Sequence, residues 1–255
     1  MIRKKILITN DDGFQAQGIR ELAMAFTELG DVTILAPDGP RSGASGSITS
    51  LVPLSLKNLK DELPGVEVYT SSGTPVDCVK LALNTIFADE KPDLLISGIN
   101  HGRNDGICVL YSGTIGAALE GAVEGIPTLA VSYMSFKGGV DFSYSIKYAL
   151  QAAKFILNNP LPPFTILSLN IPIGEPKGLK ICQQTNGRFI KEYVVVESPS
   201  GHKHYWMSGY QVSNVPHQKG DMEYLNEGYA TLVPIQTDLT NYRYLDQLRD
   251  SYPAD

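Results

Sequence analysis

Short apolar runs alternate, over the first two thirds of the chain, with longer segments whose apolar residues recur every three to four positions. The short runs predict buried strands, and the longer segments predict amphipathic helices packed on a sheet. The predicted strands are Ile6–Thr9, Val32–Ala36, Val66–Thr70, Leu94–Ser97, Thr128–Ser132 and Thr165–Leu169. The predicted helices are Ile19–Leu29 (with Gly30 as its C-terminal cap), Val76–Phe87, Ile115–Val123 and Tyr144–Leu157. This alternation predicts an α/β fold with a mainly parallel sheet flanked by helices.

The pattern changes after Ile173. Four further strands are predicted, at Leu179–Gln184, Tyr193–Val196, Tyr205–Tyr210 and Tyr229–Val233, and no helix is expected before Asn241–Arg249. The aromatic residues of this part favour a hairpin arm that meets a partner subunit or forms a small local core. We therefore expect one domain over residues 1–255, with a Rossmann-like body at 1–172, an extended hairpin and oligomerisation segment at 173–240, and a C-terminal helix at 241–255.

Composition narrows the class of protein. The 255 residues carry 21 basic and 27 acidic side chains, a net charge of −6, which disfavours binding to duplex nucleic acid or to an anionic membrane. The three cysteines, Cys78, Cys108 and Cys182, are widely spaced without a CxxC pair, which suits free thiols in a reducing compartment. The apolar run near the N-terminus is too short for a secretory signal, and no window is long enough for a membrane span. A cytoplasmic protein is expected.

Two adjacent carboxylates, Asp11 and Asp12, follow the first predicted strand. Like charges side by side repel, so this stretch is either a polar turn that caps the next helix or a cation site. Other oxygen-bearing side chains, among them Ser42 and Asn100, also follow predicted strands and should meet the aspartates at the same sheet edge. Carboxylate, hydroxyl and amide oxygens suit Mg²⁺, Mn²⁺ or Ca²⁺ better than Zn²⁺.

A second candidate site is Ser112, Gly113 and Thr114, directly before a predicted helix. Backbone N–H groups and two hydroxyls at a helix N-terminus can hold a phosphate, although an ordinary Ser/Thr cap would look the same. The sequence contains no Walker A loop, no GxGxxG and no GxSxG, which weakens the corresponding nucleotide-binding and serine-hydrolase interpretations.

The remaining metal-type and nucleophilic side chains are weaker candidates. His202 and His204 would share one face of a strand, but without a third ligand we expect exposed hairpin residues. His101 is expected near the sheet edge, facing either solvent or substrate. Cys108 has no evident base, so packing is favoured over a nucleophilic role.

Several separated motifs resemble the SurE family of nucleotidases over nearly the whole chain. They are ILITNDDG at Ile6–Gly13, APDGPRSGASGSIT at Ala36–Thr49, SSGTPVDCV at Ser71–Val79, SGINHGRN at Ser97–Asn104, YSGTIGAALEG at Tyr111–Gly121, LNIP at Leu169–Pro172 and GYATLVPIQTDLT at Gly228–Thr240. Gly46 and the segment Asp105–Leu110 depart from the usual pattern, which leaves the substrate preference open.

The resemblance implies a metal-dependent phosphomonoesterase that hydrolyses nucleoside 5′- and 3′-monophosphates, with polyphosphate as a further substrate of some members. It implies one divalent cation per subunit, Mg²⁺ or Mn²⁺, held by Asp11, Asp12, Ser42 and Asn100. The phosphate and substrate contacts implied are Asn10, Asn104, Ser112, Gly113 and Thr114. The family forms homodimers or homotetramers through C-terminal segments.

For the chemistry we expect a metal-activated water to attack the phosphate, with Asp11 or Asp12 accepting its proton. A covalent aspartyl-phosphate is a second route. The competing functions are a regulatory module that binds nucleotides without cleaving them, and a sugar-nucleotide transferase that holds a diphosphate through a metal.

Overall fold

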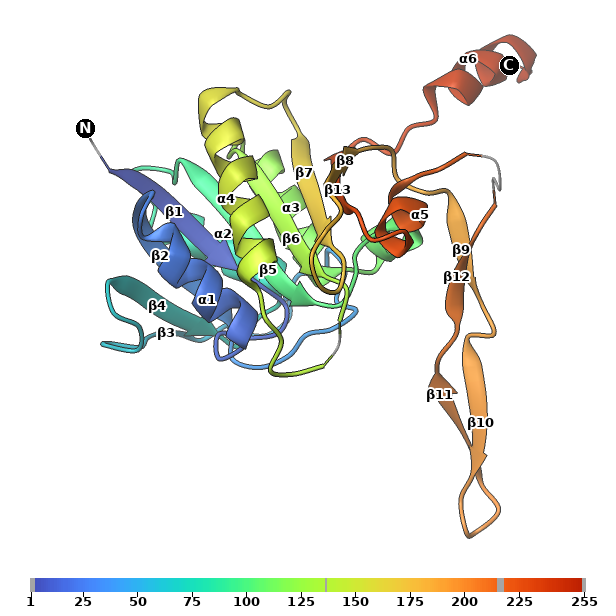
Figure 1. The fold of residues 1–255 in the computed structure, drawn as a ribbon, viewed down its shortest axis with the longest axis horizontal. Helices are drawn as coiled ribbons and strands as arrows, with labels where there is room; N and C mark the ends of the chain where they lie inside the picture. Colours follow the sequence, from blue (N-terminus) through green and yellow to red (C-terminus); the bar gives the residue numbers. More distant parts are fainter. Residues whose placement is uncertain (1–2, 136, 215–217, 254–255) are drawn as a thin grey trace.

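A nine-stranded sheet forms the centre of the molecule, a computed structural model that describes residues 3–135, 137–214 and 218–253 (Figure 1). The strand order is β3-β4-β2-β1-β5-β6-β7-β13-β8. The strands are β1 (Lys4–Thr9), β2 (Gly30–Pro37), β3 (Leu56–Asn58), β4 (Val66–Ser71), β5 (Leu94–His101), β6 (Thr128–Tyr133), β7 (Thr165–Ile171), β8 (Leu179–Ile181) and β13 (Ala230–Gln236). In the order of this sheet, the neighbouring strands from β4 across to β7 pair in parallel. The β3–β4 and β13–β7 pairs of the sheet are antiparallel. The predicted α/β fold with a mainly parallel sheet is confirmed.

Helices cover both faces of this sheet because side chains along each strand point alternately to opposite sides. Ile8 of β1 packs in the core beneath α1 (Gln17–Phe26) and α4 (Ser143–Asn158). Leu7, one residue earlier, packs in the second core with α2 (Pro75–Asn84) and α3 (Gly113–Val123). The central strands are thus buried on both faces, and their carboxyl ends are left to carry polar side chains.

An arm projects from this body as two antiparallel ladders joined end to end (Figure 1). β9 (Gly187–Ile190) pairs with β12 (Tyr210–Ser213) at the root, and β10 (Tyr193–Glu197) pairs with β11 (Lys203–Met207) toward the tip. A terminal helix, α6 (Tyr242–Ser251), extends away from the body and has no buried residue. The predicted segment 173–240 therefore also contributes β8 and β13 to the main sheet, and only part of it forms the arm.

Two local predictions are wrong. The expected single strand Tyr205–Tyr210 is divided at Gly209, whose φ of 95° and close approach to the Ile190 carbonyl (2.6 Å from an added Cβ) leave no room for a side chain. Gly30 does not cap α1, which ends at Phe26; it begins β2, where an added Cβ would lie 2.0 Å from the backbone oxygen of the neighbouring strand.

The C-terminal part also contains a helix that the sequence pattern did not predict. The short helix α5 (Asp221–Asn226) precedes the expected first helix, and the Glu223 carboxylate accepts a hydrogen bond from the Gly220 N–H at its start (2.9 Å). Its six residues are too few for a helical period to be visible in the sequence. Among the described residues, no helix is long and apolar enough to cross a membrane.

Candidate functional site

The chain turns sharply after β1, and Asn10 builds this turn. Its side-chain oxygen accepts a hydrogen bond from the Gly13 N–H (3.1 Å), and its amide nitrogen donates to the Gly13 carbonyl (3.0 Å). Gly13 has a φ of 94°, which favours glycine. Asn10 is fully buried, and through Gly13 it shapes the backbone that carries Asp11 and Asp12; its predicted contact with substrate stays a prediction.

Asp11 is buried against the start of α3. The Thr114 hydroxyl donates to Asp11 Oδ1 at 2.6 Å, and Oδ2 lies beside Gly113. Burial, with a contribution from the charge of Asp12, raises the pKa of Asp11 to about 6 although the Thr114 hydrogen bond opposes the shift. A carboxylate in this position gains from a nearby cation, because a cation offsets the cost of leaving water.

Asp12 lies on the other side of the turn and is held by His101. The His101 backbone N–H donates to Asp12 Oδ2 at 2.9 Å, and the ring nitrogen Nδ1 lies 3.3 Å from the same oxygen. The His101 ring packs edge-to-face on Phe142, with centroids 5.1 Å apart. These contacts fix one oxygen of Asp12 and leave Oδ1 without a hydrogen bond within the described part of the chain.

Asn100 and Ser42 bring further oxygens to the same place from two other strand ends. The Asn100 amide nitrogen donates to the Gly102 carbonyl at 2.8 Å, which leaves its side-chain oxygen available. The Arg41 N–H donates to the Asp11 carbonyl at 2.7 Å, and this bond places the following residue, Ser42, beside the aspartate. The Arg41 guanidinium donates a hydrogen bond to Asp38, so its positive charge is paired with Asp38 and not with Asp11.

The N-terminus of α3 closes the site. The Ser112 hydroxyl caps the helix by accepting from the Ile115 N–H (3.1 Å), and Thr114 is fully buried against Asp11. Gly113 allows the helix to approach, since a Cβ there would lie 3.0 Å from the Asp11 Cβ. Thr114 therefore contacts the Asp11 carboxylate, and its predicted contact with phosphate stays a prediction.

A cavity of about 550 Å³ opens over these residues. Five of the predicted site residues line it: Asp11, Ser42, Asn100, Asn104 and Ser112. The Asn104 amide donates to the Ser132 hydroxyl at 2.9 Å, and its backbone N–H donates to Asn170 Oδ1 at 2.8 Å, so this loop is held against β6 and β7. The structure thus gathers residues that are up to 101 positions apart in sequence, in a volume suited to a small ligand.

The same cavity has a second wall that the sequence did not predict. The arm contributes Phe189, Glu192, Met207 and Ser208, and the body adds Arg103 and Tyr111. Arg103 and Tyr111 stand within or beside the motifs already noted, but nothing in the sequence pattern links the arm to the site.

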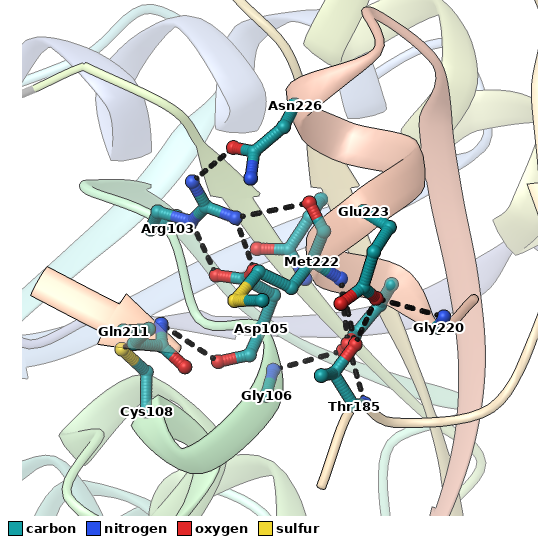
Figure 2. Close-up of polar contacts among 12 residues, drawn as sticks. Arg103, Asp105, Gly106, Cys108, Thr185, Gln211, Gly220, Met222, Glu223 and Asn226 are labelled. Atoms are coloured by element: carbon teal, nitrogen blue, oxygen red, sulfur yellow. Dashed lines mark hydrogen bonds and ion pairs between the residues drawn. The ribbon is translucent and has the colours of Figure 1, made fainter. Parts of the chain in front are cut away.

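A buried polar cluster joins the root of the arm to the loop that leads to Ser112 (Figure 2). Arg103 makes a bidentate ion pair with Asp105, which is fully buried, and also donates a hydrogen bond to Asn226 Oδ1 at 2.7 Å. The Asp221 carboxylate accepts from the Gly106 N–H at 3.0 Å and from the Thr185 N–H at 2.8 Å. Burial, with the charge of Asp105, raises the pKa of Asp221.

Cys108 and the arm histidines fit their expected roles. The Cys108 thiol accepts a hydrogen bond from Gln211 Nε2 at 3.1 Å, and burial raises its pKa to about 11, so it stays protonated at neutral pH. His202 and His204 are exposed on the arm. Among the described residues no three His, Cys, Asp or Glu side chains are grouped to hold a metal ion, so a cation at this site would need serine and asparagine oxygens as well.

The chain is similar in sequence and in fold to known proteins. A family model described as "Survival protein SurE" matches residues 6–191. The chain is 53% identical over 246 residues to a protein named 5′-nucleotidase SurE from Porphyromonas gingivalis, covering 96% of this chain and 95% of that protein. It is 39% identical over 245 residues to the protein of the same name from Bacteroides thetaiotaomicron, covering 95% and 94%. The crystal structure of a SurE protein from Aquifex aeolicus matches with a TM-score of 0.82 and 33% identity, over 96% of this chain and 98% of that one.

Proposed function

The chain belongs to the survival protein SurE family, and from this premise we propose that it is a 5′-nucleotidase, a hydrolase that releases phosphate from nucleoside 5′-monophosphates. Relatives at up to 53% identity carry that name. The observation that supports the proposal best is the convergence of Asp11, Ser42 and Asn100 on one cavity at the carboxyl ends of the strands.

The residues present fit a divalent cation. Asp12 Oδ1 and the Asn100 side-chain oxygen accept no hydrogen bond among the described residues, and Asp11 and Ser42 line the same cavity as Asn100. We assign the cation, Mg²⁺ or Mn²⁺, to Asp11, Asp12, Ser42 and Asn100, because hard oxygen donors suit these ions. When bound, such an ion polarises a phosphoryl oxygen and lowers the pKa of a bound water.

In the proposal, neighbouring side chains hold and orient the cation ligands. Thr114 fixes Asp11 and His101 fixes Asp12, so the two carboxylates present their remaining oxygens in defined directions. Ser112 and the N–H groups at the start of α3 receive the phosphate, where the helix dipole favours negative charge. Asp11 and Asp12 are the carboxylates placed to accept the proton of the attacking water.

The proposal extends in three further directions. Hydrolysis of nucleoside 3′-monophosphates and of polyphosphate follows from the family resemblance and uses the same phosphate site. A homodimer or homotetramer would cover the apolar side chains that the arm and α6 expose, such as Trp206 (68% exposed) and Tyr242 (59%). A cytoplasmic location suits the three free cysteines.

Phosphate release from AMP tests the proposal. The purified protein should lose activity in a chelator and regain it with Mg²⁺ or Mn²⁺, and Asp12→Asn should reduce the rate by several orders of magnitude. Unchanged activity of Asp12→Asn would contradict the site assignment. Tight AMP binding without turnover over a panel of divalent metals would instead favour a nucleotide-binding regulatory module.

A further inference from the structure

The cavity over the proposed metal ligands ends on the arm, and that end has a different chemistry. Asp11, Ser42 and Asn100 line one part, whereas Phe189, Glu192, Met207 and Ser208 line the other. One part thus offers oxygens for a cation and a phosphate. The other offers an aromatic ring, a thioether, a carboxylate and a hydroxyl, which suit an apolar ring with a hydrogen-bonding edge.

The orientation of Phe189 follows from strand register. Phe189 in β9 is directly opposite Gln211 in β12, so the two side chains lie on the same face of the ladder. The Gln211 side chain contacts the body: its oxygen accepts from the Ile107 N–H at 3.2 Å, and its nitrogen donates to Cys108 Sγ at 3.1 Å. That face is therefore the inner one, and Phe189 on it is half-buried.

The polar cluster at the root of the arm holds this wall in place (Figure 2). Gly106 is fixed through both backbone groups, since its N–H donates to Asp221 and its carbonyl accepts from Gln184 Nε2 at 2.7 Å. Together with Gln211, these contacts tie the arm and α5 to the loop that precedes Ser112. These hydrogen bonds hold the arm wall in a defined position relative to the phosphate end, as a selective pocket requires.

Glu192 brings an exposed carboxylate to this wall. Within the described part of the chain its carboxylate makes no hydrogen bond or ion pair, while its backbone carbonyl accepts from the Ser208 N–H at 2.7 Å. An ionised carboxylate accepts hydrogen bonds only. It would favour a base with an exocyclic amino group and oppose a carbonyl oxygen at the same position.

We propose that the root of the arm is the nucleoside-binding wall of the site, with Phe189 packing on the base and Glu192 selecting bases that carry an amino group. This inference rests on the proposed nucleotidase function and names its preferred substrates, nucleotides of adenine, guanine or cytosine. In this proposal the arm determines which nucleotide bases the site of the same subunit accepts.

Kinetics with three phosphomonoesters distinguish base recognition by Phe189 and Glu192 from a general effect on activity. Ribose 5-phosphate has the sugar and phosphate of AMP without a base, and IMP differs from AMP by a carbonyl in place of the amino group. Phe189→Leu should lower kcat/KM for AMP roughly 5- to 10-fold, mainly through KM, and leave ribose 5-phosphate within about twofold, because stacking on the base is lost. Glu192→Gln should lower the ratio of kcat/KM for AMP to that for IMP about tenfold.

Two matched variants serve as controls. Phe155 is an exposed side chain of α4, and Glu197 lies on the arm outside the cavity. Phe155→Leu and Glu197→Gln should both leave the kinetics with all three substrates unchanged. Equal losses on AMP and ribose 5-phosphate, or no change in either test variant, would overturn the inference.

Adenosine has no phosphate, so its binding tests recognition of the base without any hydrolysis. If the wild-type protein releases no phosphate from any substrate with Mg²⁺ or Mn²⁺, the proposed function fails, and calorimetry with adenosine and inosine then decides the inference. Tighter binding of adenosine than of inosine, weakened by Phe189→Leu, supports the wall. Absence of adenosine binding, or equal binding of both nucleosides, refutes it.

Discussion

The hydrogen bond between Thr114 and Asp11 offers the sharpest test of the proposed metal site. Thr114 is fully buried, its hydroxyl lies 2.6 Å from Asp11 Oδ1, and valine has nearly the same shape. Thr114→Val therefore removes one donor without opening a large cavity. A hydrogen bond to a charged group contributes about 1.5–3 kcal/mol, which corresponds to roughly 10- to 100-fold in a binding constant.

We expect this loss to appear in the affinity for the cation. The half-saturating Mn²⁺ concentration for AMP hydrolysis should rise about 10- to 100-fold in Thr114→Val, because supporting contacts to metal ligands typically have this effect. Thr114→Ser keeps the hydroxyl and should stay within about threefold of wild type. The assay is phosphate release against Mn²⁺ concentration, with calorimetric Mn²⁺ binding as a second readout.

A control variant separates this effect from a general loss of stability. Thr128→Val removes another fully buried hydroxyl, which donates to the Ile126 carbonyl at 2.8 Å far from the cavity lining. It should lower the free energy of unfolding by about 1 kcal/mol and leave the Mn²⁺ affinity unchanged. If Thr114→Val bound Mn²⁺ as tightly as wild type, Asp11 would not be a ligand that Thr114 holds in place.

Three further predictions follow from burial and close contact. Asp105→Asn removes a buried partner charge and should cost about 3–5 kcal/mol in urea unfolding, whereas Asp246→Asn, in an exposed pair, should cost less than about 0.5 kcal/mol. The raised pKa of Asp11, about 6, means that the metal-free fold holds a proton below pH 6 that Mn²⁺ must displace. The rise in Tm on adding Mn²⁺ should therefore be larger at pH 7 than at pH 5 in scanning fluorimetry, and equal rises would contradict this. Gly30→Ala should destabilise by about 1–3 kcal/mol because its Cβ would lie 2.0 Å from a backbone oxygen, while Gly46→Ala, with nothing within 4 Å, should not.

The sheet and its four large helices could be predicted because each signal is local. Ile6 to Ile8 is apolar since β1 is covered on both faces, and the apolar positions of α4 recur at the helical period because one side packs on the sheet. The gathering of Ser42 and Asn100 near Asp11 could also be predicted, because parallel strands end at the same edge.

The remaining features depend on contacts between distant segments. The contacts of Asn10 with Gly13 and of Thr114 with Asp11 could not be predicted, because sequence spacing alone does not identify these partners. The arm wall is a clearer case. Phe189 reaches the cavity only because β9 pairs with β12 in a register that turns Gln211 toward the body.

The burial of Asp11 beside a second acid indicates why this site favours a bound cation. Burial raises its pKa to about 6, so at neutral pH the metal-free fold carries an ionised group at an unfavourable position, next to a second acid. Hydrogen bonding to Thr114 offsets only part of that cost, since the pKa stays raised despite it. A positive charge would offset more of it, and the Arg41 guanidinium is paired with Asp38 instead. Under the proposed function, a bound divalent cation supplies the charge that the buried Asp11 carboxylate lacks.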